Sequence, residues 1–222
     1  MRTVNSLENI WDGNFYDIDD NVKADAKGCK GCSACCHDVG DLVVLSPYDM
    51  YRVMSEEKLE YHSLEKNHIE WTTSNKVTLP YLKMVGEAKR CSFLDANSRC
   101  TIHSNRPNIC RLFPLGRVYE NKTFKYFLQV NSCTKKELSE VKVSDWIDVR
   151  NHDENKEFLI IWHDFIKALT FKMKFVYDKA ECDRLNKLVK DTFYKDIFTN
   201  EEEFYKDFFE KLPRAKNEIG II

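Results

Sequence analysis

The chain has 222 residues, of which 43% are hydrophobic and 32% are charged, and its formal net charge is -2 at pH 7. This composition is typical of a folded globular protein and excludes an intrinsically disordered one. The small net charge argues against nucleic-acid binding through bulk electrostatics, and no apolar run approaches the length of a membrane span. We therefore expect neither nucleic acid nor a membrane as a partner. No secretory signal is visible, so we expect a cytoplasmic location, and the oligomeric state stays open.

Three regions of different character follow one another along the chain. Residues 1–28 are polar and acidic, and we predict a loop or an N-terminal arm there. Residues 29–133 contain eight of the nine cysteines, and we interpret them as a metal-binding domain. Residues 134–222 lack this density of cysteines, and we predict that they form a helical C-terminal subdomain.

Short strands and tight turns dominate the predicted structure of the cysteine region. The predicted strands cover residues 41–45 and 76–85, and the predicted hairpins pair 91–94 with 100–103 and 117–119 with 123–131. A helix is predicted to begin at Ser46-Pro47 and to reach about residue 59. Ser46 can cap this helix, Pro47 suits its first position, and Asp49 lies where a capping carboxylate would.

Amphipathic helices are predicted after the cysteine region. Apolar residues at three- and four-residue spacing indicate helices over residues 154–175 and 180–193. A last helix begins at the capping sequence from Thr199 to Glu202, and we expect Pro213 to end it. Together these elements predict an α+β fold, with a small metal-organised core of short strands and loops and a helical C-terminal part.

Four cysteines lie within eight residues of one another, namely Cys29, Cys32, Cys35 and Cys36. Thiols at two-residue gaps can direct their sulfur atoms to one point, as zinc or an iron–sulfur cluster requires. Two adjacent cysteines are hard to place on one tetrahedral ion together with both earlier ones. The pair Cys35-Cys36 therefore suggests two separate sites, or one ligand and one free thiol.

The other cysteines of this region are candidate metal ligands as well. They are Cys91, Cys100, Cys110 and Cys133. Eight thiolates could make two four-cysteine sites, and the first three cysteines match the opening of a ferredoxin-type [4Fe–4S] run. Spacing alone does not decide between iron and zinc. Two other interpretations are a redox dithiol, which leaves most cysteines unexplained, and buried cysteines without metal, for which eight clustered residues are atypical.

Several charged residues lie next to the cysteines in sequence. Arg106 and Arg111 could offset the negative charge of a thiolate-rich site, or they could form ordinary surface ion pairs. His37 could act as a ligand or donate a hydrogen bond to a sulfur, although a loop histidine in solvent is the simpler interpretation. Cys182 is remote from the cluster, and we interpret it as a plain helix cysteine.

A fixed series of motifs occurs in one order between residues 29 and 133. It comprises the run from Cys29 to Cys36, then Cys91-Ser-Phe-Leu, Cys100-Thr-Ile-His, and Arg106-Pro-Asn-Ile-Cys110-Arg-Leu-Phe-Pro. This series resembles the YkgJ-type CxxCxxCC family, which is described as zinc- or iron-chelating. His103 departs from the Tyr that this family often has, so no ligand role is assigned to it. The resemblance implies metal binding more strongly than it implies an activity.

Three functions agree with the cysteines and with this resemblance. The first is a cytosolic metal-binding protein with a thiolate-ligated [4Fe–4S] cluster and room for a second metal site. The second is a metal-dependent enzyme that modifies a protein or peptide, since flagellin lysine N-methylases carry a similar cluster. The third is a zinc-structured interaction module without catalysis. No nucleotide-binding glycine motif is present, and the sequence assigns no catalytic residue and leaves open whether the protein is an enzyme.

Overall fold

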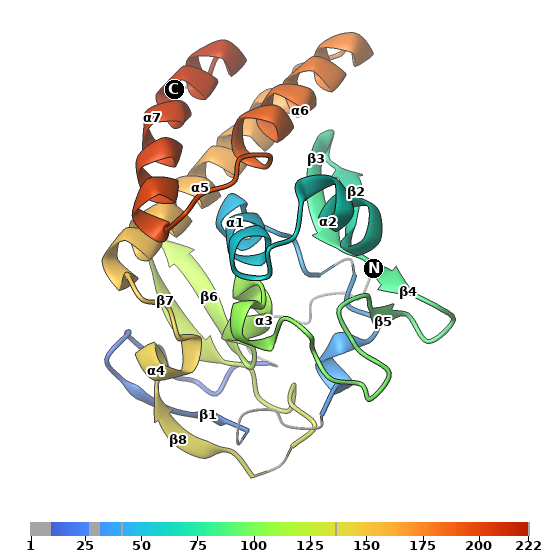
Figure 1. Cartoon of the computed structure of the whole chain (residues 1–222). Helices are drawn as coiled ribbons and strands as arrows, with labels where there is room; N and C mark the ends of the chain where they lie inside the picture. Colours follow the sequence, from blue (N-terminus) through green and yellow to red (C-terminus); the bar gives the residue numbers. More distant parts are fainter. Residues whose placement is uncertain (1–9, 27–31, 41, 136, 222) are drawn as a thin grey trace.

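The structure, a computed structural model, describes residues 10–26, 32–40, 42–135 and 137–221 (Figure 1). Its strands are β1 (Asn21–Asp25), β2 (Ile69–Ser74), β3 (Val77–Leu82), β4 (Met84–Val85), β5 (Arg90–Cys91), β6 (Leu115–Glu120), β7 (Thr123–Leu128) and β8 (Ser139–Lys142). Its α-helices are α1 (Pro47–Glu56), α2 (Tyr61–His68), α3 (Asn108–Leu112), α4 (Val143–Ile147), α5 (His152–Met173), α6 (Lys179–Phe193) and α7 (Glu201–Ile219). Single turns of 3₁₀ helix are η2 (Ala34–Cys36) and η3 (His103–Asn105). This mixture of helices and short antiparallel strands confirms the α+β fold.

The described strands pair into small antiparallel sheets of two strands each, β1–β8, β2–β3, β4–β5 and β6–β7. The β6–β7 pair confirms the second predicted hairpin, and its register places Glu120 opposite Thr123 at the turn. The chain before β1 runs beside β7, because Tyr16 forms a bridge with Tyr126. The N-terminal segment is thereby attached to the hairpin that follows the cysteine loops.

The strand β1 corrects the expectation of a loop or arm over residues 1–28. It pairs with β8 in a register that sets Val22 opposite Val141. Val22 and Ala24 are buried and alternate with exposed polar residues, as in any half-buried strand. The acidic residues just before β1 hide this short alternation in the sequence. The first nine residues of the predicted arm and its last two lie outside the described residues.

The hairpin predicted from residues 91–94 and 100–103 is confirmed only next to its turn, where the backbone N–H of Thr101 donates to the carbonyl of Phe93 (2.9 Å). β5 pairs with β4 instead, and an isolated bridge is what joins the two predicted strands. Asp95 explains the difference, because its carboxylate accepts hydrogen bonds from the backbone N–H groups of Asn97 (2.8 Å) and Arg99 (2.9 Å). A turn closed by a side chain in this way competes with strand pairing.

The two other strands predicted in the cysteine region are confirmed in part. Residues 76–85 form strand structure that is divided between β3 and β4. Of residues 41–45, the structure describes all but the first, and they contribute a single bridge between Val44 and Tyr81 rather than a strand. This bridge still lays the segment along β3, where it leads into α1.

The start of α1 has the predicted capping box. The backbone N–H of Ser46 donates to the Asp49 carboxylate (2.8 Å), and the backbone N–H of Asp49 donates to the Ser46 hydroxyl (3.2 Å). The second Asp49 oxygen accepts a hydrogen bond from the backbone N–H of Asn108 (2.6 Å). Asp49 therefore joins the start of α1 to the start of α3. The helix ends at Glu56, earlier than predicted, and α2 follows as a separate helix.

Aromatic side chains connect α1 to the C-terminal helices. The Tyr48 ring is stacked on Tyr205 with 5.7 Å between ring centroids, and it contacts Phe204 edge-on at 5.5 Å. Phe158 of α5 completes this group, with its centroid 6.1 Å from that of Tyr48. The hydrophobic core is therefore continuous from the cysteine region into α5 and α7. The domain boundary near residue 134 stays a sequence prediction.

The C-terminal helices α5, α6 and α7 lie together at one end of the molecule (Figure 1). They confirm the predicted helices, but Pro213 lies inside α7 and does not end it. Leu212 and Ala215 are buried on either side of the proline. Their packing offsets the free energy that is lost because a proline removes one backbone hydrogen bond of the helix. The helix ends instead at Gly220, which has a positive φ of 73°. None of the described helices is both long and apolar enough to span a membrane.

Candidate metal centre

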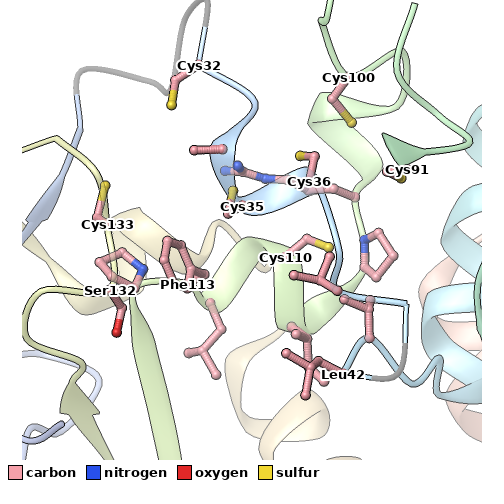
Figure 2. Close-up of a pocket in the computed structure, with 18 of the residues that line it drawn as sticks. Cys32, Cys35, Cys36, Leu42, Cys91, Cys100, Cys110, Phe113, Ser132 and Cys133 are labelled. Atoms are coloured by element: carbon pink, nitrogen blue, oxygen red, sulfur yellow. The ribbon is translucent and has the colours of Figure 1, made fainter. Parts of the chain in front are cut away.

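A cavity of about 1200 Å³ lies among the loops of the cysteine region. Figure 2 shows that cysteines from separate segments surround it. The cysteines that line it are Cys32, Cys35, Cys36, Cys91, Cys100, Cys110 and Cys133. Among the described cysteines, Cys182 alone is outside this lining, on α6. Cys29, also a predicted ligand, lies outside the described residues.

Five separate segments of the chain carry these sulfur atoms, namely residues 32–36, 91, 100, 110 and 133. Cys35 and Cys36 lie on the single turn η2, which is closed by a hydrogen bond from the N–H of Cys36 to the carbonyl of Ser33 (2.8 Å). Cys91 ends β5, and Cys110 lies on α3. Loops supply the others. The contact of Asp49 with the first residue of α3 therefore also fixes the helix that carries Cys110.

The cysteines are distributed across the cavity. Figure 2 shows Cys32 and Cys133 at one side, and Cys91, Cys100 and Cys110 at the other, with Cys35 and Cys36 between them. The Cys32 sulfur lies 3.8 Å from the hydroxyl of Thr134, the residue that follows Cys133. The double cysteine of η2 is thus the junction between two groups of thiols.

Every described cysteine is a free thiol. No three metal-binding side chains in the described part of the chain are close enough to hold a single ion as they stand. The thiols share the wall of one cavity without meeting at a point. Their chemistry nevertheless fits a soft metal centre, because thiolates are the preferred ligands of both zinc and iron–sulfur clusters.

The two adjacent cysteines of η2 differ in acidity. The Cys36 thiol is hydrogen bonded to Cys35 and lowers the pKa of Cys35, although burial acts in the opposite direction. The positive charge of Arg106 lowers this pKa further, and His37 acts in the same direction. The same hydrogen bond, together with burial, raises the pKa of Cys36. Of the pair, Cys35 is therefore the one that ionises first.

The cysteines at the other side of the cavity are stabilised as neutral thiols. Burial raises the pKa values of Cys91, Cys100 and Cys110, and the charges of neighbouring thiolates raise them further. The Cys110 pKa is affected by both Cys91 and Cys100, and the Cys36 pKa by both Cys110 and Cys91. Cys35 raises the pKa values of Cys91, Cys100 and Cys110 as well. These five sulfurs are close enough to interact electrostatically, and we call them the inner cysteines. A bound cation would displace their protons.

Comparison with known families identifies the part of the chain that forms this cavity. Residues 28–134 match the model of the CxxCxxCC family, which is described as a "Putative zinc- or iron-chelating domain". We call residues 28–134 the CxxCxxCC domain, after the family model that they match. The match includes every cysteine that lines the cavity and stops before α5. Neither the curated proteins nor the solved structures contain a match to the chain.

The two predicted arginines occupy different places in the CxxCxxCC domain. Arg106 lines the cavity, and its charge favours the thiolates of Cys35 and Cys100. Arg111 is buried outside the lining, and its guanidinium donates hydrogen bonds to the carbonyl oxygens of Ser104 (2.6 Å) and Ile147 (3.2 Å). Geometry therefore favours Arg106 for charge compensation and Arg111 for holding the backbone.

The structure adds to what the sequence indicated for three residues in or directly after the CxxCxxCC domain. His37 is not a loop histidine in solvent, since it is half-buried, lines the cavity, and has Nδ1 2.9 Å from the Ser33 carbonyl. Lys135 also lines the cavity and donates to the Ala26 carbonyl (2.9 Å). Arg52 is buried and donates to the loop before α3. No local pattern marks Lys135 or Arg52, because their partners are distant in sequence.

Proposed function

We propose that the CxxCxxCC domain binds a [4Fe–4S] cluster through thiolates of its cavity. The observation that carries this proposal is the gathering of seven cysteines, from five separate places in the chain, around one cavity of about 1200 Å³. Such an arrangement is unnecessary for a hydrophobic core, and it gives soft ligands from several directions.

The separation of the thiols favours a cluster over a single zinc ion. Zinc needs each sulfur at roughly 2.3 Å from one point, so that its four sulfurs nearly touch. In a [4Fe–4S] cluster each thiolate binds a different iron, so its sulfurs stand farther apart. The described cysteines stand around a shared space rather than at one point of it (Figure 2).

We assign the cluster to four of the inner cysteines, namely Cys91, Cys100, Cys110 and one of the adjacent pair Cys35 and Cys36. Their mutual electrostatic interactions and their placement on η2, β5, α3 and the loop before it support this choice. Cys32, Cys133 and the other cysteine of the pair would then form the start of a second thiolate site. Cys29 stays a predicted ligand from its spacing in the sequence.

Each residue of the site has a defined task in this proposal. When bound, a [4Fe–4S] cluster supplies one-electron redox chemistry. Four of the inner cysteines hold it, and Arg106 offsets part of the negative charge that the thiolates bring. We propose a cytoplasmic location, where thiols stay reduced and available as metal ligands.

Metal content of anaerobically purified protein tests the proposal. About four irons per chain, with visible absorption, are expected for one cluster. Cys110→Ser should lose most of this iron, whereas Cys182→Ser, which changes a cysteine outside the cavity, should retain it. One or two zinc ions with negligible iron would contradict the cluster and favour a zinc-structured interaction module.

A second candidate is a metal-dependent enzyme that modifies a protein or peptide. Leu42 and Ile109 favour it, because both are large exposed apolar residues and both line the cavity. Apolar residues at the mouth of a reactive site can hold a peptide segment. Under this proposal, Ile109→Ser would weaken substrate binding and leave the metal content unchanged. An equal loss of metal would show that Ile109 supports the cavity instead.

A further inference from the structure

The turn between α5 and α6 exposes three aromatic side chains. Phe171 and Phe175 each have 61% of their surface exposed, and Tyr177 has 87%. Phe171 and Phe175 lie one helical turn apart, with their ring centroids separated by 5.3 Å. Figure 1 places this turn at the top of the molecule, at the end away from β8 and the cysteine loops. The exposed rings contribute little to the core, which α5 enters through Leu169 and Met173 instead.

Lysines accompany the exposed rings. Lys76, in the turn between β2 and β3, donates a hydrogen bond to the Val176 carbonyl (2.7 Å) and has its Nζ 5.3 Å from the centroid of the Tyr177 ring. The Lys174 Nζ lies 5.8 Å from the centroid of the Phe171 ring. We call Phe171, Phe175, Tyr177 and the lysines of this turn the basic aromatic tip. It joins two segments that are distant in sequence.

The basic aromatic tip is positively charged, although the chain as a whole has a formal charge of -2. Residues 167–179 contain four lysines (167, 172, 174 and 179) and one acidic residue, Asp178. With Lys76 the balance is five positive charges against one negative charge. The Asp178 carboxylate is engaged in capping α6, since it accepts a hydrogen bond from the N–H of Ala180 (3.1 Å). The next acidic residue, Glu181, is paired with the guanidinium of Arg184 at 2.7 Å.

The shape and chemistry of the tip fit a membrane surface. The tip projects from a helical turn, and none of its three rings lines the cysteine cavity or the smaller cavity beside the start of α7. Aromatic rings are stable at the level of lipid headgroups, and lysine side chains extend past them to reach phosphates. Several lysines close to an anionic leaflet add a favourable electrostatic term.

We propose that the basic aromatic tip docks on membrane surfaces that contain anionic lipids. The sequence-based expectation of no membrane partner rests on the absence of a spanning segment, whereas surface docking requires none. The lysines select anionic headgroups, and the rings enter the interface. The tip lies far from the cavity, so this docking is independent of the metal that the CxxCxxCC domain binds.

Cosedimentation of the full chain with lipid vesicles tests this docking. Vesicles of mixed phosphatidylglycerol and phosphatidylcholine should bind the protein, and vesicles of phosphatidylcholine alone should not. Binding should weaken as salt is added, because salt screens the lysines. The double variant Phe171→Ser/Phe175→Ser should bind at least about tenfold more weakly, since it removes two interfacial rings. The double variant Lys174→Glu/Lys179→Glu should lose most of its binding to the anionic vesicles.

Ile197→Ser is the matched control, because Ile197 is 64% exposed and lies outside the tip. This control should bind vesicles like the wild type. The proposal is overturned if the wild type does not bind anionic vesicles, if it binds neutral vesicles equally well, or if the tip variants bind unchanged. Self-association that the Phe171→Ser/Phe175→Ser variant abolishes, without vesicle binding, would also overturn it and assign the tip to a second copy. Unchanged circular dichroism melting of the variants excludes loss of folding as the cause.

Discussion

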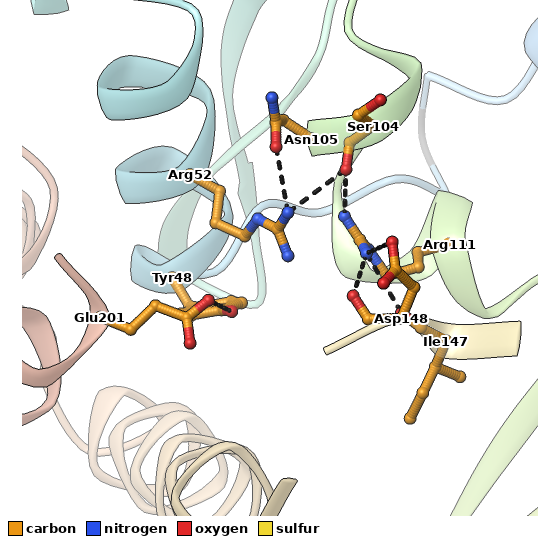
Figure 3. A network of polar contacts seen from close by, with 8 residues as sticks. All are labelled: Tyr48, Arg52, Ser104, Asn105, Arg111, Ile147, Asp148 and Glu201. Atoms are coloured by element: carbon orange, nitrogen blue, oxygen red, sulfur yellow. Dashed lines mark hydrogen bonds and ion pairs between the residues drawn. The ribbon is translucent and has the colours of Figure 1, made fainter. Parts of the chain in front are cut away.

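Arg52 of α1 and Arg111 of α3 donate hydrogen bonds to the same acceptor, the carbonyl oxygen of Ser104 (Figure 3). The distances are 3.2 Å from Arg52 Nη2 and 2.6 Å from Arg111 Nη2. Both guanidinium groups belong to buried residues. Ser104 lies between Cys100 and Cys110, so the two arginines fix the loop that separates two of the inner cysteines.

Replacing Arg111 by Met should destabilise the fold. The variant removes the Arg111 donor from the buried Ile147 carbonyl and leaves the Ser104 carbonyl with Arg52 as its side-chain donor, and a buried group that loses its donor costs about 1–3 kcal/mol. Urea denaturation of the metal-free protein measures the loss. Arg184→Met, at an exposed residue of α6, is the control and should leave the free energy of unfolding almost unchanged. Equal stability of the two variants would show that Arg111 does not hold the loop.

Asp49→Ala should destabilise both α1 and α3. The substitution removes the cap of α1 and the acceptor for the backbone N–H of Asn108. Loss of a helix cap costs about 1 kcal/mol, and the buried donor left without a partner adds about 1–3 kcal/mol. Thermal unfolding measures the total. The matched control is Asn200→Ala, which removes the cap of α7 without leaving a buried donor. This variant should lower the free energy of unfolding only by the contribution of a lost helix cap.

A pH dependence of stability is expected from His163. Its ring is stacked on Tyr119 with 4.0 Å between ring centroids, and burial lowers its pKa below the ordinary value of 6.5. Because the folded-state pKa is the lower one, the unfolded chain takes up the proton first as the pH falls. The stability that His163 contributes is therefore complete above pH 6.5 and is lost progressively below it.

Denaturation midpoints between about pH 7 and about pH 5 measure this effect. His163→Gln removes the titrating ring, so the midpoint of this variant should fall less steeply with pH than that of the wild type. The variant also loses the stacking on Tyr119, which lowers its stability at neutral pH without changing the slope. Identical slopes in the two proteins would contradict the assignment.

Local patterns in the sequence predict the helices well but do not reveal long-range pairing. The α1 cap follows from Ser46 and Asp49, which are three residues apart, whereas the second contact of Asp49 reaches Asn108, 59 positions later. The strand β1 is too short and too close to acidic residues to be recognised without its partner β8. Pro213 would end an isolated helix, and packing on both sides of it keeps α7 continuous.

In the candidate site too, local sequence patterns predict some features, whereas contacts between distant residues could not be predicted. Cysteine chemistry alone predicts that the thiols gather, and the structure places seven of them around one cavity. The sequence does not indicate that Cys32 lies beside Thr134, because 102 positions separate them. It also gives Arg106 and Arg111 the same expected role, since both flank Cys110. Their different surroundings depend on α4, which approaches Arg111 from another part of the chain.

Removing the metal should loosen the cysteine loops and leave the helical end of the molecule intact. Among the described residues, no three metal-binding side chains converge on one point in the protein alone. We therefore expect a bound metal centre to link η2, β5 and α3. By contrast, α5 and α7 are held by the aromatic contacts of Tyr48, Phe158 and Phe204, which need no metal. Regions with few packed contacts open at low free energy, whereas core helices open near the global limit.

Amide hydrogen exchange before and after anaerobic chelation measures this difference. Residues 32–36 and 108–112 should exchange faster once the metal is removed, and α5 and α7 should keep their protection. Cys110→Ser should reproduce the exchange pattern of the chelated protein without any chelator, and Cys182→Ser should behave like the untreated wild type. Faster exchange throughout the chain would mean that the metal stabilises the whole core. No change in residues 32–36 and 108–112 would mean that these cysteines do not bind it.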